Sequence, residues 1–378
     1  MAKVLLLVGG GHAHLSVLAG LKKVVRGGHR AILVSPGDYH YYSGMGPGVL
    51  AGTYRPAQAR FHLRRMVQER GGVFLKGEAV GIDPERRTVR LASGEELGYD
   101  VVSFNVGSEV VADRLEAAGE AVVPVKPITN LPAARRRILE GLAQGPLRLV
   151  VVGGGPAGLE VAGNLWRLGQ AGRGRLGITL ASAHGLLYGF PPRAGTLARN
   201  SLAARGIRVL EGERVLKVAG GQALLSGGST VPCDIAILAA GIRPPSLFGT
   251  SGLPVGPDGG LLVNDYLQSV AFPEIFGGGD CIHFQPRPLA RVGVYAVRQN
   301  PILFHNLRAA LGGGALRPFR PQKDYMLIFN LGDGRGILRR KGWVWDGHPA
   351  CLFKDWIDRR FMKKFQLSGE AREAGDDI

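Results

Sequence analysis

The stretch KVLLLVGGGHAH at residues 3–14 and its counterpart LRLVVVGGGPAG at residues 147–158 decide the fold of this chain. Each is an apolar run typical of a buried strand, followed by a Gly-rich turn and the start of a helix. The first glycine of such a turn permits the sharp bend, and the second lets the backbone approach a pyrophosphate. These glycines are Gly9 and Gly11 in the first copy and Gly153 and Gly155 in the second. Two copies predict two dinucleotide sites.

The two copies differ at their third position, where a small residue usually lets helix and strand pack closely. His14 stands there in the first copy and Gly158 in the second. The strand after each copy also lacks the acidic residue that usually binds the ribose, since one ends at Ser35 and the other at Ser182. The choice between NAD and NADP therefore stays open.

Length and composition indicate an α/β protein with two domains and a smaller segment. The 378 residues exceed what one compact core holds, and the 59 glycines are spread over short turns without a collagen-like period. The formal net charge of +17 includes no basic block, so we expect no nucleic-acid partner. The charge is compatible with a solvated basic surface or with attraction to an anionic membrane.

The cysteine content and the hydropathy limit the possible cellular location of the protein and its possible redox and metal chemistry. Cys233, Cys281 and Cys351 are far apart in the sequence, so neither a redox-active disulfide nor a metal site is predicted. No run approaches the roughly 20 apolar residues of a membrane span, and the first apolar run ends in glycines instead of a cleavage site. We expect a cytoplasmic protein that is soluble or held peripherally on the inner face of the membrane. The oligomeric state stays open.

The order of the predicted elements indicates interleaved domains. An apolar strand at residues 99–108 closes the first unit, and residues 233–241 repeat this in the second. A strand with a Gly-Asp turn at residues 274–280 and a helix at residues 292–311 then resume the first unit. We predict an α/β fold of two interleaved Rossmann-like dinucleotide-binding domains with a small strand-rich and helical C-terminal segment. The expected bounds are 1–110 and 255–315 for the first domain, 111–254 for the second and 316–378 for the C-terminal segment.

Three further motifs accompany the Gly-rich turns, namely YSGM at residues 42–45, YAVRQ at residues 295–299 and KDWIDRRFM at residues 354–362. On the basis of these motifs and the Gly-rich turns, nearly the whole chain resembles the pyridine nucleotide-disulfide oxidoreductase superfamily. Within that superfamily it is similar to the type II NADH dehydrogenase and sulfide:quinone oxidoreductase branch. The closest likeness is to the flavoprotein module fused elsewhere to selenophosphate synthetase, which suggests a selenium link by association alone.

The resemblance implies FAD and NAD(P)H as cofactors. It places the FAD pyrophosphate at Gly9 and Gly11, the adenine at the backbone of Val80 and the ribityl chain at Asp280. It places the pyrophosphate of the nicotinamide dinucleotide at the second Gly-rich turn, with residues Gly153, Gly155 and Gly158. The remaining candidates for cofactor binding are His12, Ala13, Ser35, Ser43, Pro47, Gly107, Pro156, Gly241, Gly279, Tyr295 and Ala296.

Two side chains are candidates for the chemistry. Glu160 matches an acid near the nicotinamide in related enzymes, and the alternative is an ordinary acid in the first turn of a helix. Lys126 would stabilise the negative charge that arises on a reduced flavin, and the alternative is an exposed loop lysine.

We predict that nicotinamide passes a hydride to FAD, and that the flavin passes electrons to a quinone-like acceptor. Without a cysteine pair, the dithiol chemistry of related enzymes is unavailable. Two alternatives stay open. One is a soluble acceptor, such as a protein, a disulfide or a selenium compound, and the other is a redox-sensing flavoprotein without significant turnover.

The segment from residue 352 to 361 has the pattern of a basic amphipathic helix. Its expected apolar face consists of Phe353, Trp356, Ile357 and Phe361. The residues expected away from this face are Lys354, Asp355 and Arg359. Such a helix either lies in a membrane interface, where a quinone would enter, or packs on its own domain.

Overall fold

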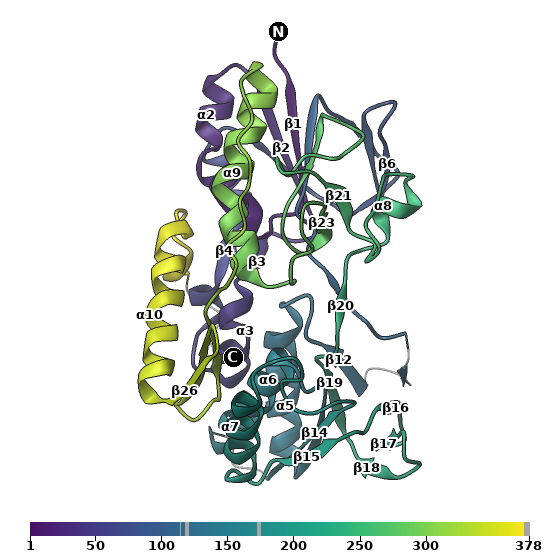
Figure 1. Cartoon of the computed structure of the whole chain (residues 1–378), viewed down its shortest axis with the longest axis vertical. Coiled ribbons are helices and arrows are strands. Elements are labelled where there is room, and N and C mark those ends of the chain that lie inside the picture. The colour runs from purple at the N-terminus through teal and green to yellow at the C-terminus, as the bar shows by residue number, and fades with distance from the viewer. Residues whose placement is uncertain (114, 118–120, 172–174, 374–378) are drawn as a thin grey trace.

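The first apolar run forms the centre of a five-stranded parallel sheet in the computed structural model, which describes residues 1–113, 115–117, 121–171 and 175–373 (Figure 1). The order of the strands is β22-β9-β1-β2-β5. Strand β1 pairs with a strand on each side, and its residues 5–8 are buried. The bounds are β1 Val4–Val8, β2 Arg30–Ser35, β5 Val73–Lys76, β9 Val101–Phe104 and β22 Ile275–Gly277.

The second apolar run is the central strand of a second parallel sheet, in the order β12-β19-β13-β14-β15. Four neighbouring strands repeat the arrangement of the first sheet, with β13 in the place of β1. The bounds are β12 Val122–Pro124, β13 Leu147–Val152, β14 Leu176–Ser182, β15 Arg208–Glu211 and β19 Ile235–Leu238.

The chain passes between these two units twice. Strands β10 (Glu109–Val110) and β20 (Ile242–Arg243) pair antiparallel at the double crossing, and β22 then completes the first sheet (Figure 1). The predicted fold of two interleaved Rossmann-like units is therefore confirmed. The exact domain bounds stay predictions.

Helices and small antiparallel sheets complete each unit. The first unit has η1 His12–His14, α1 Leu15–Ala19, α2 Leu21–Arg26, η2 Ser43–Met45, α3 Gly46–Ala51, η3 Pro56–Ala59, α4 Leu63–Gln68, α8 Leu247–Thr250, η5 Gly279–Cys281 and α9 Gly293–Gly312. Its small strands are β3 Tyr39–Tyr41, β4 Arg60–His62, β6 Ala79–Asp83, β7 Thr88–Leu91, β8 Glu96–Gly98, β21 Leu261–Val263 and β23 Ile282–Phe284. The second unit has α5 Asn130–Gln144, α6 Pro156–Ala171, α7 Pro192–Ala203, β11 Glu116–Ala117, β16 Val215–Ala219, β17 Gln222–Leu225 and β18 Thr230–Pro232.

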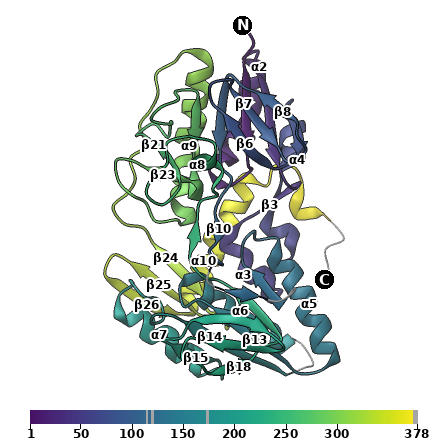
Figure 2. The same cartoon turned by 90° about the vertical axis from the view of Figure 1, so that its right-hand side faces the viewer.

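The C-terminal segment packs on both units. It consists of strands β24 Leu327–Asn330, β25 Gly336–Arg340 and β26 Trp343–Gly347, helix α10 His348–Phe365 and η6 Glu370–Arg372. Phe329 and Ile337 of its sheet belong to the core of the second unit, whereas Met362 and Phe365 of α10 belong to the core of the first. Figures 1 and 2 show α10 rising from the small sheet toward the first unit. The segment thus joins the two units.

Helix α10 divides its faces differently from the sequence expectation. Lys354 was expected away from the apolar face, but its side chain is largely buried, while Phe353 and Trp356 of that face are 42% and 55% exposed. The reason is that Lys354 Nζ pairs with Asp358 at 2.7 Å and donates to the carbonyl oxygen of Gly44 at 2.6 Å. A buried charge that is paired and hydrogen-bonded is tolerated in a protein interior. In the described part of the chain, no helix is both long and apolar enough to span a membrane.

A substitution at Gly163 tests the packing of the C-terminal segment on α6. A Cβ there would overlap the carbonyl oxygen of Leu331, so we expect Gly163→Ala to lower the free energy of unfolding by about 2 kcal/mol, as overpacking typically does. Gly249 in helix α8 is the control, because a Cβ there would meet nothing within 4 Å. Gly249→Ala should leave stability unchanged or raise it by about 0.5–1 kcal/mol. Urea unfolding measures both, and equal effects would contradict the packing argument.

Candidate functional site

The first Gly-rich turn lies against the end of strand β9. Gly9 has a φ of +84°, and a Cβ on it would overlap the carbonyl oxygen of Asn105. A Cβ on Gly11 would overlap the side-chain oxygen of the same Asn105. Both positions therefore require glycine, because the backbone conformation and the close approach exclude a side chain.

Asn105 connects this turn to the segment after β22, where the chain has come back to the first unit. Its Oδ1 accepts the backbone N–H of Ala13 at 2.9 Å, and its Nδ2 donates to the carbonyl oxygen of Gly278 at 2.6 Å. The turn after β1, the end of β9 and the turn after β22 are thus tied at one buried amide. Sequence reasoning missed this role. The sequence feature that could have indicated this role is a polar asparagine within the otherwise apolar run at residues 99–108.

His14 explains how the first copy tolerates its departure from the pattern. Its Nδ1 lies 2.6 Å from the carbonyl oxygen of Gly9 and its Nε2 lies 2.8 Å from Ser103 Oγ. Burial lowers the pKa of His14 to about 4, so the ring is neutral at physiological pH. The chain forms the 3-10 turn η1 at this position, whereas α6 begins directly after the three consecutive glycines of the second copy. His14 is therefore a structural residue inside the turn.

The second Gly-rich turn is subject to the same steric constraint, and it has all three glycines of the pattern. Gly153 has a φ of +124°, and a Cβ there would overlap the carbonyl oxygen of Ala239 at the end of β19. A Cβ on Gly158 would overlap the carbonyl oxygen of Gly153. Helix α6 begins at Pro156, so Pro156 occupies the first helical position that suits proline.

Three predicted cofactor residues leave room for a ligand beside the backbone. A Cβ on Gly107, Gly155 or Gly241 would meet no protein atom within 4 Å. These positions lie in the segments after β9, β13 and β19, at the carboxyl ends of the parallel strands. Ligands of open α/β sheets bind at this edge. The residues present therefore fit a dinucleotide at each turn.

Lys126 and Asp280 come together from distant parts of the chain. Lys126 Nζ lies 2.8 Å from Asp280 Oδ2 and donates to Ser108 Oγ at 2.6 Å. The hydroxyl of Ser108 in turn donates to Asp280 at 2.9 Å. Lys126 is therefore not the exposed loop lysine of the alternative interpretation, since only 23% of its side chain is exposed.

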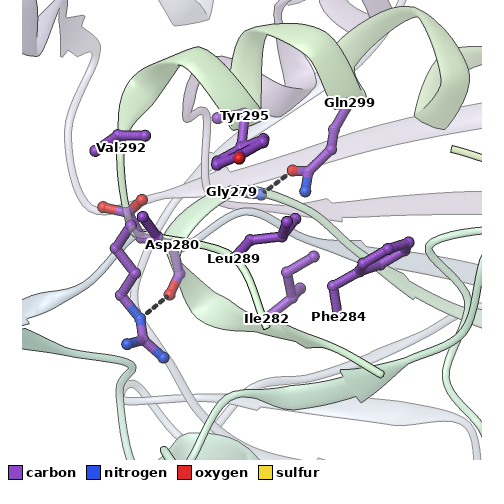
Figure 3. Close-up of a pocket in the computed structure, with 11 residues that line it drawn as sticks. Gly279, Asp280, Ile282, Phe284, Leu289, Val292, Tyr295 and Gln299 are labelled. Carbon is purple, nitrogen blue, oxygen red and sulfur yellow. Dashed lines mark hydrogen bonds between the residues drawn. The ribbon is translucent and has the colours of Figure 1, made fainter. Parts of the chain in front are cut away.

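A small pocket lies between Asp280 and the start of α9 (Figure 3). Gln299 Oε1 accepts the backbone N–H of Gly279 at 2.7 Å, and Arg291 Nε donates to the carbonyl oxygen of Asp280 at 3.0 Å. The lining residues are Gly279, Asp280, Ile282, Phe284, Leu289, Ala290, Arg291, Val292, Tyr295, Ala296 and Gln299. Four of the predicted residues are thus brought together here. Gln299 belongs to the motif at residues 295–299 and, with Arg298, was a further sequence candidate for a position near the flavin.

The other predicted FAD residues lie around the same unit. Ser35 ends β2 and is buried, and Pro47 is buried in α3. Ser43 precedes α3, with its Oγ near Gly293 at the start of α9. Val80 lies on β6, is 41% exposed and does not line the pocket. The predicted adenine contact at Val80 stays a prediction.

Glu160 faces the C-terminal segment. Its Oε1 accepts the backbone N–H of Asn330 at 2.7 Å. Burial raises the pKa of Glu160 to about 7, although the Lys354 ammonium and the Asn330 N–H stabilise the carboxylate. Lys354 and Asp358 of α10 also meet the loop at residues 42–45, because Tyr42 donates to Asp358 at 3.0 Å. Two motifs of the sequence resemblance thus meet beside Glu160.

The cysteines form no redox pair. All three are free thiols, and Cys281, the one next to Asp280, is buried in the core of the first unit. Burial raises the pKa of Cys281 to about 12, so it remains a thiol. Among the residues that the structure describes, no group of three or more His, Cys, Asp or Glu side chains is placed to hold a metal.

Comparisons with known proteins agree with this geometry. The family model described as pyridine nucleotide-disulphide oxidoreductase matches residues 3–300. The chain is 27% identical over 338 residues to the probable ferredoxin reductase CtmF of Castellaniella defragrans, covering 84% of this chain and 77% of that relative. It is 22% identical over 312 residues to the mitochondrial internal alternative NAD(P)H-ubiquinone oxidoreductase A1 of Arabidopsis thaliana, covering 73% of this chain and 60% of that relative.

A solved structure shares the whole fold. NDH2 of Plasmodium falciparum in complex with NADH matches with a TM-score of 0.80 at 14% identity, over 100% of this chain and 99% of that one. The predicted superfamily is confirmed by the family match. The likeness to the module fused to selenophosphate synthetase stays a prediction.

The raised pKa of Glu160 predicts a pH dependence of stability. The folded protein favours the protonated acid, so this stabilisation is fully present below the ordinary pKa of 4.5 and is lost as the pH rises through about 7. Relative to Glu160→Gln, the free energy of unfolding of the wild type should fall by about 3 kcal/mol across that range. Urea unfolding between pH 4.5 and 8 measures it. Glu140→Gln, at a 69% exposed side chain, is the control, and parallel curves for all three proteins would refute the shift.

Proposed function

The chain belongs to the pyridine nucleotide-disulphide oxidoreductase family, and we propose that it carries electrons from NAD(P)H, through FAD, to a quinone-like acceptor. The observation that carries this proposal is the presence of two Gly-rich turns, each at the carboxyl end of a five-stranded parallel sheet. FAD and NAD(P)H, the cofactors expected from the sequence, agree with this family. When bound, FAD accepts a hydride from the nicotinamide and passes electrons on.

The residues of the first unit hold and tune the flavin in this proposal. Gly9 and Gly11 give the backbone room at the diphosphate, and Asp280 accepts hydrogen bonds from the ribityl hydroxyls. The ammonium group of Lys126 supplies a positive charge, and its position is fixed by Asp280 and Ser108. A fixed positive charge in a partly buried site stabilises negative charge that develops during reduction.

Glu160 acts on the nicotinamide side. Its carboxyl is anchored by Asn330 and lies in the field of Lys354, and its pKa near 7 lets it exist in both protonation states around neutral pH. A group poised in this way can take up or release a proton at little cost. The buried Cys281 thiol has no such freedom, which supports electron transfer without a thiol relay.

An exposed aromatic surface supports an acceptor that is dissolved in a membrane. Five large apolar side chains on β26 and the first half of α10 are exposed, and we call them together the aromatic face: Trp343, Trp345, Leu352, Phe353 and Trp356. Phe353 and Trp356 stack at 5.9 Å, and Arg360 lies over the Trp356 ring. Exposed aromatic rings beside basic side chains are typical of proteins that lie in a membrane interface. A peripheral position would bring a lipid-soluble quinone to the protein.

A soluble electron-carrier protein is the second candidate acceptor. The similarity to the probable ferredoxin reductase favours it, because that relative is matched over 84% of this chain. Turnover with a quinone and not with a ferredoxin-type protein would decide for the first candidate.

The visible spectrum tests the donor side. We expect purified protein reconstituted with FAD to show a bound-flavin spectrum that bleaches when NADH or NADPH is added without oxygen. Glu160→Gln should slow this bleaching at least tenfold, while Glu140→Gln should leave it unchanged. Persistence of the flavin spectrum with both nucleotides would favour a redox sensor, and absence of bound flavin would contradict the proposal.

Liposome binding tests the membrane position. We expect the triple variant Trp343→Ser, Phe353→Ser, Trp356→Ser to bind anionic liposomes more than tenfold more weakly than the wild type, since a loss of 1.4 kcal/mol is tenfold. Deletion of α10 is unsuitable, because Met362 and Phe365 belong to the core. The control is Tyr188→Ser, at a ring that is 76% exposed in the second unit. Equal binding by all three proteins would exclude the aromatic face as the contact.

A further inference from the structure

An ion pair of the first unit lies next to the pocket and has no role in the proposed function. Arg291 Nη2 lies 2.5 Å from Asp258 Oδ2, and His283 Nδ1 lies 3.0 Å from the same oxygen. The three side chains are largely shielded from solvent, with exposed fractions of 19%, 32% and 10% for Arg291, Asp258 and His283. Asp258 lies in the turn before β21 and belongs to none of the sequence motifs.

The turn at residues 256–260 gives the Asp258 carboxylate a defined position. The backbone N–H of Gly256 donates to the carbonyl oxygen of Gly260 at 2.8 Å. Asp258 Oδ1 accepts the backbone N–H of Gly260 at 3.1 Å, which leaves Oδ2 for the ion pair. The turn packs directly on β23, because a Cβ on Gly256 would overlap the ring of His283.

Arg291 connects this acid to the expected flavin site. Its Nε donates to the carbonyl oxygen of Asp280 at 3.0 Å (Figure 3), while its Nη2 pairs with Asp258. Arg291 and Asp280 line the same pocket, and Arg291 stands two residues before α9. The guanidinium group is thus anchored at the main chain of Asp280 and neutralised by Asp258.

One oxygen of the Asp280 carboxylate is available to a ligand. Lys126 Nζ lies 2.8 Å from Oδ2, and Ser108 donates its hydroxyl to the same oxygen at 2.9 Å. No group of the described residues donates to Oδ1. The side chain lines the pocket and is 17% exposed, and an ionised carboxylate oxygen accepts hydrogen bonds. A hydroxyl of a polyol chain in the pocket therefore fits Oδ1.

Arg291 would compete for that oxygen if it were released from Asp258. A guanidinium group stays charged, carries only donors, and binds carboxylates with two parallel hydrogen bonds. Because Arg291 already bonds the carbonyl oxygen of Asp280, the carboxylate of the same residue is an alternative partner close at hand. Such a pair would have to break before a ligand hydroxyl could bind Oδ1.

We propose that Asp258 is a positioning residue that holds Arg291 away from Asp280 Oδ1 and so keeps this oxygen free for a ribityl hydroxyl of FAD. The charge of Asp258 carries this role, because an ionised acceptor binds a guanidinium group more strongly than a neutral one does. The inference rests on the proposed function, which supplies the contact between Asp280 and the ribityl chain.

The variant Asp258→Asn tests the role of the charge and keeps the turn. Asparagine retains an oxygen for the N–H of Gly260 and is itself favoured in turns, but its amide nitrogen is a donor and cannot accept from Arg291. We expect Asp258→Asn to weaken the binding of FAD to the apoprotein by about tenfold, because Arg291 then pairs with the carboxylate of Asp280. Quenching of flavin fluorescence measures the dissociation constant.

A double variant separates positioning from a general loss of packing. Arg291→Gln removes the competing cation and should weaken FAD binding only about threefold, through the lost bond to the carbonyl of Asp280. Adding Arg291→Gln to Asp258→Asn should therefore restore the affinity to that of Arg291→Gln alone. If Asp258 only supported the fold, the two losses would add instead. The control is Asp234→Asn, at an ion pair with Arg148 in the second unit, which should bind FAD like the wild type.

Competition by ADP locates the effect along the cofactor. ADP shares the adenosine and the diphosphate of FAD and lacks the ribityl chain. Its inhibition constant against FAD should therefore be the same for Asp258→Asn and for the wild type. An equal loss of affinity for ADP and for FAD would indicate a general disruption of the site and would refute the role of Asp258.

The outcomes distinguish this inference from the proposed function. Unchanged FAD affinity in Asp258→Asn, or a double variant that binds more weakly than both single variants, would overturn the role of Asp258 while leaving the flavoprotein intact. Failure of the wild type to bind FAD would overturn both. Tight FAD binding without bleaching by NAD(P)H would contradict the proposed function alone.

Discussion

The structure depends on a close approach of backbones that occurs twice. In each unit the turn after the central strand lies so near the end of the neighbouring strand that the first glycine has no room for a side chain. Gly9 meets the carbonyl of Asn105, and Gly153 meets the carbonyl of Ala239. Because the contact is between backbones, no side-chain rearrangement can relieve it. This contact fixes the turn at the carboxyl edge of each parallel sheet, where a dinucleotide binds.

The same constraint explains why much of the fold could be predicted from the sequence. Apolar strand runs, Gly-rich turns and their repetition are local patterns, and they predicted both sheets and the interleaving of the units. The predicted helix at residues 292–311 corresponds to α9 within one residue at each end. Local patterns carry no information on which side chains that are distant in sequence contact one another. The contacts of Asn105 with Ala13 and Gly278, and that of Lys126 with Asp280, span from 92 to 173 residues and needed the structure.

Helix α10 shows why amphipathic patterning alone was insufficient. The pattern placed Phe353 and Trp356 on one apolar face, directed either to a membrane or to the protein, and placed Lys354 away from that face. In the folded chain Lys354 finds Asp358 one turn away and the carbonyl of Gly44 across the interface, so the charge is stable inside. Desolvation of the Lys354 ammonium is offset by Asp358 on the same helix and by the carbonyl of Gly44, which lies 310 residues away in sequence. The burial of Lys354 is thus the departure from the pattern, and it results from the contact between two motifs of the family resemblance.

The two Gly-rich turns differ in how they place the residue at their third position. In the second copy Gly158 allows the helix to approach the carbonyl of Gly153, and α6 extends for 16 residues. In the first copy a ring nitrogen of His14 bonds the corresponding carbonyl of Gly9, and the helix begins as a 3-10 turn. Both ring nitrogens of His14 are engaged, one with Gly9 and the other with Ser103. The first turn is thus braced by the side chains of Asn105 and His14, whereas in the second turn Gly158 lies directly against the backbone of Gly153.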